Sequence, residues 1–131
     1  MSFLAQLSLE EEVYNVIHCT YHFEQDVDRN HKPSGIPRGG RITLLIEARG
    51  NSELLRWMVD PAHTKDGKIT FFRRDEHARL FHLRFQKAYC IEYHEHFNHD
   101  SNVPMQIQLC ISVQKMHAEK AAFENKWPVT L

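Results

Sequence analysis

The sequence predicts a mainly β protein, either an antiparallel β-barrel or a two-sheet sandwich of six to seven strands, with one short α-helix. Two long stretches carry this prediction, because apolar residues alternate with polar ones from residue 81 to 93 and from 105 to 113. Successive side chains of a strand point to opposite faces, so a period of two indicates strands with one buried face. The 131 residues, 42% hydrophobic and 25% charged, are typical of one globular domain, residues 1–131.

The first part of the sequence predicts three strands. Apolar residues alternate from Phe3 to Leu9, and the acidic turn Glu10-Glu11-Glu12 leads into a second strand from about Val13 to Phe23. A third strand begins after Gly39-Gly40, where the apolar residues at 42, 44 and 46 share one face. We expect each strand to turn its apolar face to a common core.

One short helix follows the third strand. Asn51 or Ser52 can cap it, Glu53 suits its positive N-terminal end, and Pro61 stops it. Its predicted apolar stripe consists of Leu54, Leu55 and Met58. A helix of roughly nine residues is not stable alone, so we expect it to pack on a sheet or to plug one end of a barrel.

The remaining strands form the second half of the predicted fold. A fourth strand covers Lys68 to Arg74, after the turn signal Asp66-Gly67. The apolar face of the fifth consists of Phe81, Leu83, Phe85, Tyr89, Ile91 and Tyr93. Lys87 interrupts that face and marks a bulge or bend. The sixth strand covers 105–113, and the segment from Asn98 to Pro104 supplies the hairpin turn before it.

The segment from Gln25 to Gly40 has no apolar period. Unstructured loops of this length are uncommon inside a compact domain and are usually functional or disordered. Two prolines stiffen the segment, and its glycines permit turns that other residues resist. We therefore predict a projecting arm at about residues 25–40 that becomes ordered against a partner, with a flexible excursion as the alternative.

Charge and apolar patterning exclude several classes of protein. Sixteen Lys and Arg against 17 Asp and Glu give a net charge of -1, so no global positive field attracts nucleic acid. Apolar runs such as Leu44-Leu45-Ile46 are too short for membrane insertion, and no basic and apolar leader predicts a signal peptide. Cys19, Cys90 and Cys110 lack C-x-x-C spacing, which favours reduced thiols in a cytosolic protein.

The histidine-rich end of the fifth strand is the nearest approach to a reactive site. Cys90, Glu92, His94 and His96 share one face if the strand continues, and His99 follows in the turn. Zinc accepts such ligands, but alternate strand residues are about 7 Å apart, so a tetrahedral site needs further ligands from elsewhere. The interpretation is a solvated strand face, with no catalytic, cofactor or metal site. A metalloenzyme that uses His94, His96 and His99 is the alternative hypothesis.

The other charged pair that invites a catalytic interpretation is Asp75 with Glu76. These carboxylates follow Arg73-Arg74 in a segment that predicts a hairpin turn. Solvated turn charges explain them better than general acid–base chemistry does.

Short segments distributed over nearly the whole chain carry a resemblance to a known family. They are Met1-Ser2-Phe3-Leu4-Ala5, His18-Cys19-Thr20-Tyr21, Gln25-Asp26 with Asp28, Pro33-Ser34, Pro37-Arg38-Gly39-Gly40, Trp57-Met58, Phe71 with Arg73-Arg74-Asp75, Ala88-Tyr89-Cys90, Tyr93-His94-Glu95, Pro104-Met105, and Asn125 with Trp127-Pro128. In their order and spacing the sequence resembles the tube protein of the type VI secretion system, Hcp, and in particular its divergent branch TssD.

The resemblance implies a β-barrel-like protomer, six copies of which close into a hexameric ring with a wide lumen. Rings stack into a tube that is surrounded by sheath proteins, capped by a spike protein and expelled when the sheath contracts. Some members carry effector proteins in the lumen. A structural, non-enzymatic subunit of this kind would reside in the bacterial cytoplasm before firing and then be secreted to the extracellular space or a target cell.

The resemblance also assigns a role to the arm, because the corresponding loop of the family reaches towards neighbouring subunits or the adjacent ring. The expected assembly contacts are Asp26, Asp28, Pro33, Pro37, Arg38, Gly39 and Gly40. Two alternatives remain open, a ring-forming cargo adaptor of the same system and an unrelated β-barrel that binds a ligand in its mouth.

Overall fold

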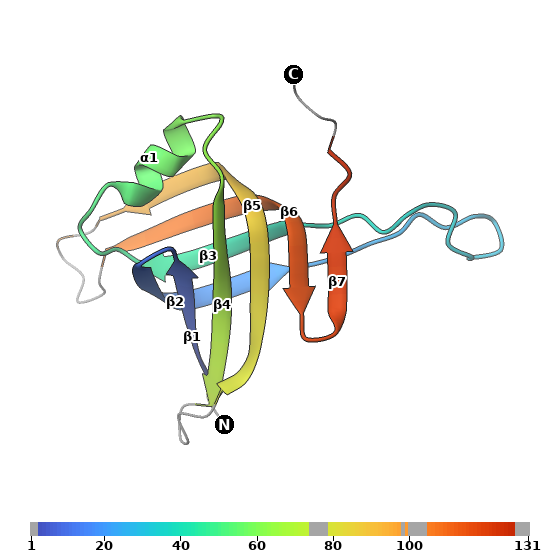
Figure 1. The fold of residues 1–131 in the computed structure, drawn as a ribbon, viewed down its shortest axis with the longest axis horizontal. Coiled ribbons are helices and arrows are strands. Elements are labelled where there is room, and N and C mark those ends of the chain that lie inside the picture. Colours follow the sequence, from blue (N-terminus) through green and yellow to red (C-terminus); the bar gives the residue numbers. More distant parts are fainter. Residues whose placement is uncertain (1–2, 74–78, 98, 100–104, 128–131) are drawn as a thin grey trace.

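The computed structural model describes residues 3–73, 79–97, 99 and 105–127 (Figure 1). Within these residues the elements follow one another as β1 (Phe3–Leu9), β2 (Glu12–Tyr21), β3 (Arg41–Glu47), α1 (Glu53–Val59), β4 (Lys65–Arg73), β5 (Arg79–His96), β6 (Gln106–Ala118) and β7 (Ala121–Glu124). The mainly β class with one short helix is therefore confirmed.

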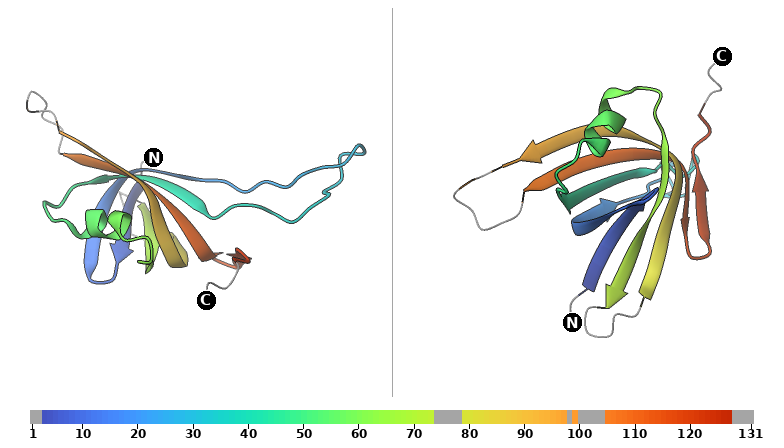
Figure 2. Two further views of the ribbon diagram at one scale, coloured as in Figure 1. Left: turned by 90° about the horizontal axis from the view of Figure 1, so that it is seen from above. Right: turned by 60° about the vertical axis from the view of Figure 1, so that its left-hand side comes forward.

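The strands form a closed barrel rather than a sandwich. The sheet has the order β3-β2-β1-β4-β5-β6-β7, every pairing in it is antiparallel, and β3 pairs with β6 as well as with β2. Six strands thus close on themselves, and β7 extends the sheet beyond β6 (Figure 2). Closure removes the exposed edges that an open sheet would present.

Alternating residues of the strands fill the barrel, as the sequence predicts. On β3 the side chains of Ile42, Leu44 and Ile46 are fully buried. The buried set on β6 begins with Ile107, Leu109, Ile111 and Val113. The predicted inward faces are therefore confirmed except at Met105, which precedes β6 and is 39% exposed.

The helix packs against β5, but its apolar stripe differs from the prediction. Trp57 is 1% exposed and its indole Nε1 donates a 3.0 Å hydrogen bond to the carbonyl oxygen of Ala88. Leu55, which we expected inside, is 43% exposed. At 3.6 residues per turn, Trp57 follows Leu54 on the same face while Leu55 points about 100° away. The amide of Glu53 is capped by the side chain of Asn51 rather than of Ser52.

Strand β5 is bent at Lys87, as predicted, but the bend changes which residues face inward. Lys87 has φ of 51°, and its backbone N–H donates to Oδ1 of Asp66 on β4. Leu83 and Phe85 are buried before the bulge, whereas Ala88 and Cys90 are buried after it. The prediction that Tyr89 and Ile91 continue the apolar face is wrong, because the bulge shifts by one residue the set of side chains that point into the barrel.

The predicted turn Asp66-Gly67 is also wrong, since both residues lie inside β4. A Cβ atom at Gly67 would lie 2.6 Å from the carbonyl oxygen of Ser8 on β1. The glycine therefore permits the close approach of two strands instead of a turn. Other boundaries also differ from the prediction, since β2 ends at Tyr21 rather than Phe23 and β6 continues to Ala118 rather than ending at 113.

Two predicted turns involve residues that the structure does not describe. Asp75 and Glu76 lie outside the described residues, and so does the 98–104 segment except for His99. The antiparallel pairing of β5 with β6 nevertheless confirms the hairpin that this second turn connects. Within the described part of the chain, no helix is long and apolar enough to span a bilayer.

Candidate assembly surfaces

The segment between β2 and β3 projects far from the barrel, at the end opposite to α1 (Figures 1 and 2). Every residue from 22 to 38 is exposed, including Val27 at 58% and Ile36 at 75%. Exposed apolar side chains on a protruding segment are typical of surfaces that bind a partner. The segment at about residues 25–40 therefore has the shape of a projecting arm.

The arm is a two-stranded ribbon, held by its own hydrogen bonds. Glu24 and Arg38 exchange backbone hydrogen bonds of 2.9 and 2.7 Å. The guanidinium of Arg38 also lies 2.8 Å from Asp26 and 3.5 Å from Glu24. These side chains are more than half exposed, so each ion pair contributes little to stability. Together they fix the direction in which the arm leaves the barrel.

Asp28 organises the tip of the arm. Its Oδ1 accepts hydrogen bonds from the backbone N–H groups of Asn30 at 2.8 Å and Lys32 at 3.1 Å. His31, with φ of 65°, completes this turn, and Pro33 forms an isolated β-bridge with Val27. The tip is therefore shaped before any partner arrives, which lowers the entropy that binding must overcome.

The base of the arm is anchored to β6 and to the segment after β7. The side-chain Nδ2 of Asn125 donates to the carbonyl oxygens of Val113 at 2.8 Å and Gly39 at 3.3 Å. Gly40 has φ of 94° and is buried, so a side chain at this position would be strained. Phe23 packs against Phe123 with ring centroids 4.9 Å apart.

The structure therefore divides the predicted assembly residues into two groups. Asp26, Asp28, Pro33 and Arg38 lie on the exposed ribbon, whereas the two glycines lie at its anchored base. Pro37 contributes to an apolar groove of about 260 Å³ beside that base, whose other lining residues are Tyr21, Phe23, Met116, Ala118, Ala121, Ala122 and Phe123. Sequence reasoning missed Phe23 and Phe123 as anchors, because no local pattern pairs residues so distant in the chain.

Strand β7 provides a second candidate surface. Among the described strands it pairs only with β6, so its outer edge has no neighbouring strand. An unpaired edge offers backbone donors and acceptors to another chain. It is the part of the sheet that barrel closure leaves open.

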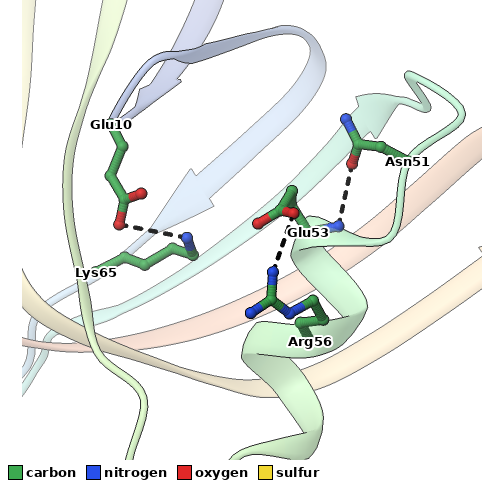
Figure 3. Close-up of polar contacts among 5 residues, drawn as sticks. All are labelled: Glu10, Asn51, Glu53, Arg56 and Lys65. Carbon is green, nitrogen blue, oxygen red and sulfur yellow. Dashed lines mark hydrogen bonds and ion pairs between the residues drawn. The ribbon is translucent and has the colours of Figure 1, made fainter.

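An acidic hollow of about 270 Å³ lies between the β1–β2 turn and α1. Figure 3 shows that two of its carboxylates have partners: Glu10 lies 3.4 Å from the Nζ of Lys65, and Glu53 lies 3.2 Å from Arg56. The side chain of Lys65 is only 6% exposed, so the anion of Glu10 offsets the burial of its charge. Burial and the nearby carboxylate of Glu12 raise the pKa of Tyr14 at the same hollow. These contacts hold the turn to the barrel.

At the histidine-rich end of β5, Cys90 lies on a different face from Glu92, His94 and His96. Cys90 is buried, Glu92 is exposed, and the pairing with β6 shifts register between them. Burial raises the pKa of the Cys90 thiol to about 11, so it is a poor metal ligand or nucleophile at neutral pH. No group of three His, Cys, Asp or Glu among the described residues is arranged to hold a metal ion. The geometry does not favour the metalloenzyme hypothesis.

The barrel is filled by side chains, the arm is shaped by its own hydrogen bonds, and one sheet edge is open. These features are typical of a structural protein that assembles with other chains. A family model described as "Hemolysin coregulated protein Hcp (TssD)" matches residues 1–128. The chain therefore belongs to the Hcp (TssD) family, which confirms the resemblance and the interpretation as a structural subunit of the secretion tube. A search of curated proteins finds no significant match.

Solved structures agree with this assignment. Hcp1 from Flavobacterium johnsoniae is 35% identical, with a TM-score of 0.87 over 93% of this chain and 99% of that one. Hcp1 from Salmonella typhimurium shares 10% identity and a TM-score of 0.71 over 88% and 85% of the two chains. A chain from the sheath–tube complex of an extracellular contractile injection system, PVC, has 16% identity and a TM-score of 0.54 over 88% and 87%. The latter two comparisons show a shared fold.

Proposed function

We propose that six copies of this chain close into a ring, and that rings stack through the arm into the inner tube of a type VI secretion system. The observation that carries the proposal is the likeness to an Hcp1 at 35% identity over nearly the full length of both chains. The arm supplies the physical means, because it protrudes at the end opposite to α1 and a head-to-tail contact must join two different surfaces.

Assembly rather than catalysis is the proposed activity. Within the described residues, the barrel interior is occupied by large buried side chains such as Trp57, Tyr14 and Phe85. In the acidic hollow, Glu10, Glu12 and Glu53 form ion pairs with Lys65, Arg49 and Arg56. These features support a building block, and they argue against the alternative of a barrel that binds a ligand in its mouth.

The proposed partners are further copies of the chain, the sheath and spike proteins, and effector proteins carried in the lumen. A neighbour from a sheath–tube complex supports a fold suited to such a tube. The proposed location is the bacterial cytoplasm before firing and the extracellular space or a target cell afterwards. The exposed arm residues Asp26, Asp28, Pro33 and Arg38 are the proposed contacts, and Pro37, Gly39 and Gly40 position them.

Size-exclusion chromatography with light scattering, followed by negative-stain microscopy, tests the proposal. We expect a species of six times the 15.5 kDa chain mass and images of rings. Rings that form but never stack would favour the cargo adaptor instead of the main tube. A strictly monomeric chain at every concentration would refute both.

A further inference from the structure

The outer face of the barrel carries a row of cationic and histidine side chains across three adjacent strands. In the β-sheet register, Lys68 on β4 lies directly opposite Arg84 on β5, and Arg84 lies directly opposite His117 on β6. The flanking residues Ile69, Leu83 and Met116 are buried, so the three members of the row point outward. Neighbouring strands are about 4.8 Å apart, which places these side chains side by side.

No ion pair joins this row to a carboxylate in the described part of the chain, because no carboxylate oxygen there lies within 4.0 Å of the side-chain nitrogens of Lys68, Arg84 or His117. Glu119 is the acidic residue that lines the same hollow as Arg84 and His117. Like charges directly opposite one another destabilise a sheet. An acidic partner that covers the row would offset this repulsion.

The row borders a hollow that can receive such a partner. The hollow has a volume of about 480 Å³ and is lined by His82, Arg84, Gln86, His117 and Glu119. His82 is held by a 3.0 Å hydrogen bond between its Nδ1 and the hydroxyl of Thr70. Lys115 on β6 stands outside this lining and lies opposite Gln86, which extends the cationic surface by one position.

We propose that this surface, defined by Lys68, Arg84, His117 and the adjoining hollow, binds an acidic polypeptide segment of another protein. Carboxylates three or four residues apart on a helix are about 5–6 Å apart, close to the spacing of the row. The amide of Gln86 adds hydrogen-bonding groups that suit carboxylates and backbone carbonyls.

Two other occupants fit less well. Binding of single-stranded nucleic acid relies on aromatic stacking, and the lining contains no Phe, Tyr or Trp. A second copy of this chain would have to offer carboxylates, but its two densest acidic groups are already engaged. Glu10 and Glu12 of the β1–β2 turn pair with Lys65 and Arg49, and the arm carboxylates pair with Arg38.

Fluorescence anisotropy with a labelled oligoglutamate peptide tests the proposal on the assembled protein, at a low salt concentration of about 50 mM. We expect the variant Lys68→Gln/Arg84→Gln to bind the peptide about three- to thirtyfold more weakly than the wild type. The matched control Arg56→Gln/Lys126→Gln makes the same charge change away from the row and should bind like the wild type. Thermal unfolding should show that the first variant is at least as stable as the wild type.

Each other outcome overturns the proposal in a distinct way. Absence of peptide binding, or equal binding by both variants, removes the role of the row. Tighter binding of an oligonucleotide with the same number of charges would assign the surface to nucleic acid. A changed oligomeric state of Lys68→Gln/Arg84→Gln in light scattering would show that a second copy covers the row. The wild-type mass in the same measurement tests the ring itself, so failure of the ring and failure of peptide binding are distinguished.

Discussion

Replacing Gly39 by alanine tests how the arm is held to the barrel. A Cβ atom at this position would lie 2.1 Å from Cδ1 of Phe23, so the aromatic ring must move. The displaced ring loses its edge contact with Phe123, 4.9 Å away, which is worth about 0.5–1.5 kcal/mol. Phe23 is 42% exposed, so the loss of its remaining apolar burial adds only a fraction of a full side chain. We expect the free energy of unfolding to fall by about 1–2 kcal/mol.

Thermal unfolding of the isolated chain and sedimentation of assembled tubes measure this effect. The Tm should fall by about 3–10 °C, and fewer tubes should sediment because the arm loses its fixed direction. Gly35→Ala is the matched control, since no atom lies within 4 Å of a Cβ at that position. Both substitutions lower the conformational entropy of the unfolded chain in the same way. In a Phe23→Ala background, Gly39→Ala should cost almost nothing. An equal loss with and without Phe23 would refute the steric reasoning.

Three further predictions concern buried polar groups. Asn125→Ala removes the donor to two backbone carbonyls and should lower the unfolding free energy by about 1–2 kcal/mol in urea denaturation, and Asn125→Asp should not restore it because a carboxylate cannot donate. Glu10→Gln should lower the free energy of unfolding by about 1–3 kcal/mol, because the Lys65 ammonium loses its anion. Lys65→Met should lower it by less. A larger loss for Lys65→Met than for Glu10→Gln would contradict the argument that the buried ammonium needs its anion. Burial raises the pKa of the Cys90 thiol above its ordinary 9.0 to about 11, so the folded chain binds more protons between these values. Stability should therefore fall as pH rises from 9 to 11, and Cys90→Ala should reduce that fall; an unchanged slope would exclude Cys90 as its source.

The predicted features that the structure confirms have local causes. The inward faces of β3 and β6 follow from alternation over consecutive residues. The bulge at Lys87 could be predicted because a charged residue interrupts an apolar face. The arm could be predicted because its length, prolines and glycines are incompatible with regular structure. The family assignment also came from the sequence, since short motifs in a fixed order identify a fold more specifically than any one of them.

The features that differ from the prediction depend on partners in space. After Lys87, the side chains of β5 that point into the barrel depend on the bulge, which the hydrogen bond from the Lys87 N–H to Asp66 on β4 holds in place. Gly67 matches a turn signal locally but lies in a strand, because β1 approaches it too closely for a side chain. Leu55 and Trp57 are both apolar, but Trp57 shares the buried face of Leu54 and donates a hydrogen bond to the carbonyl of Ala88 on β5.

The sequence by itself therefore determined the class, the family, the strands and the existence of an arm. Only the tertiary structure decided that the sheet closes through β3 and β6, and that the arm is anchored by Asn125, 86 residues from Gly39. It also decided that Lys68, Arg84 and His117 lie in one row. The periodicity of a sequence shows which side chains of one segment are buried. Closure of the barrel, anchoring of the arm and the cationic row depend instead on the register between segments that are distant in the chain.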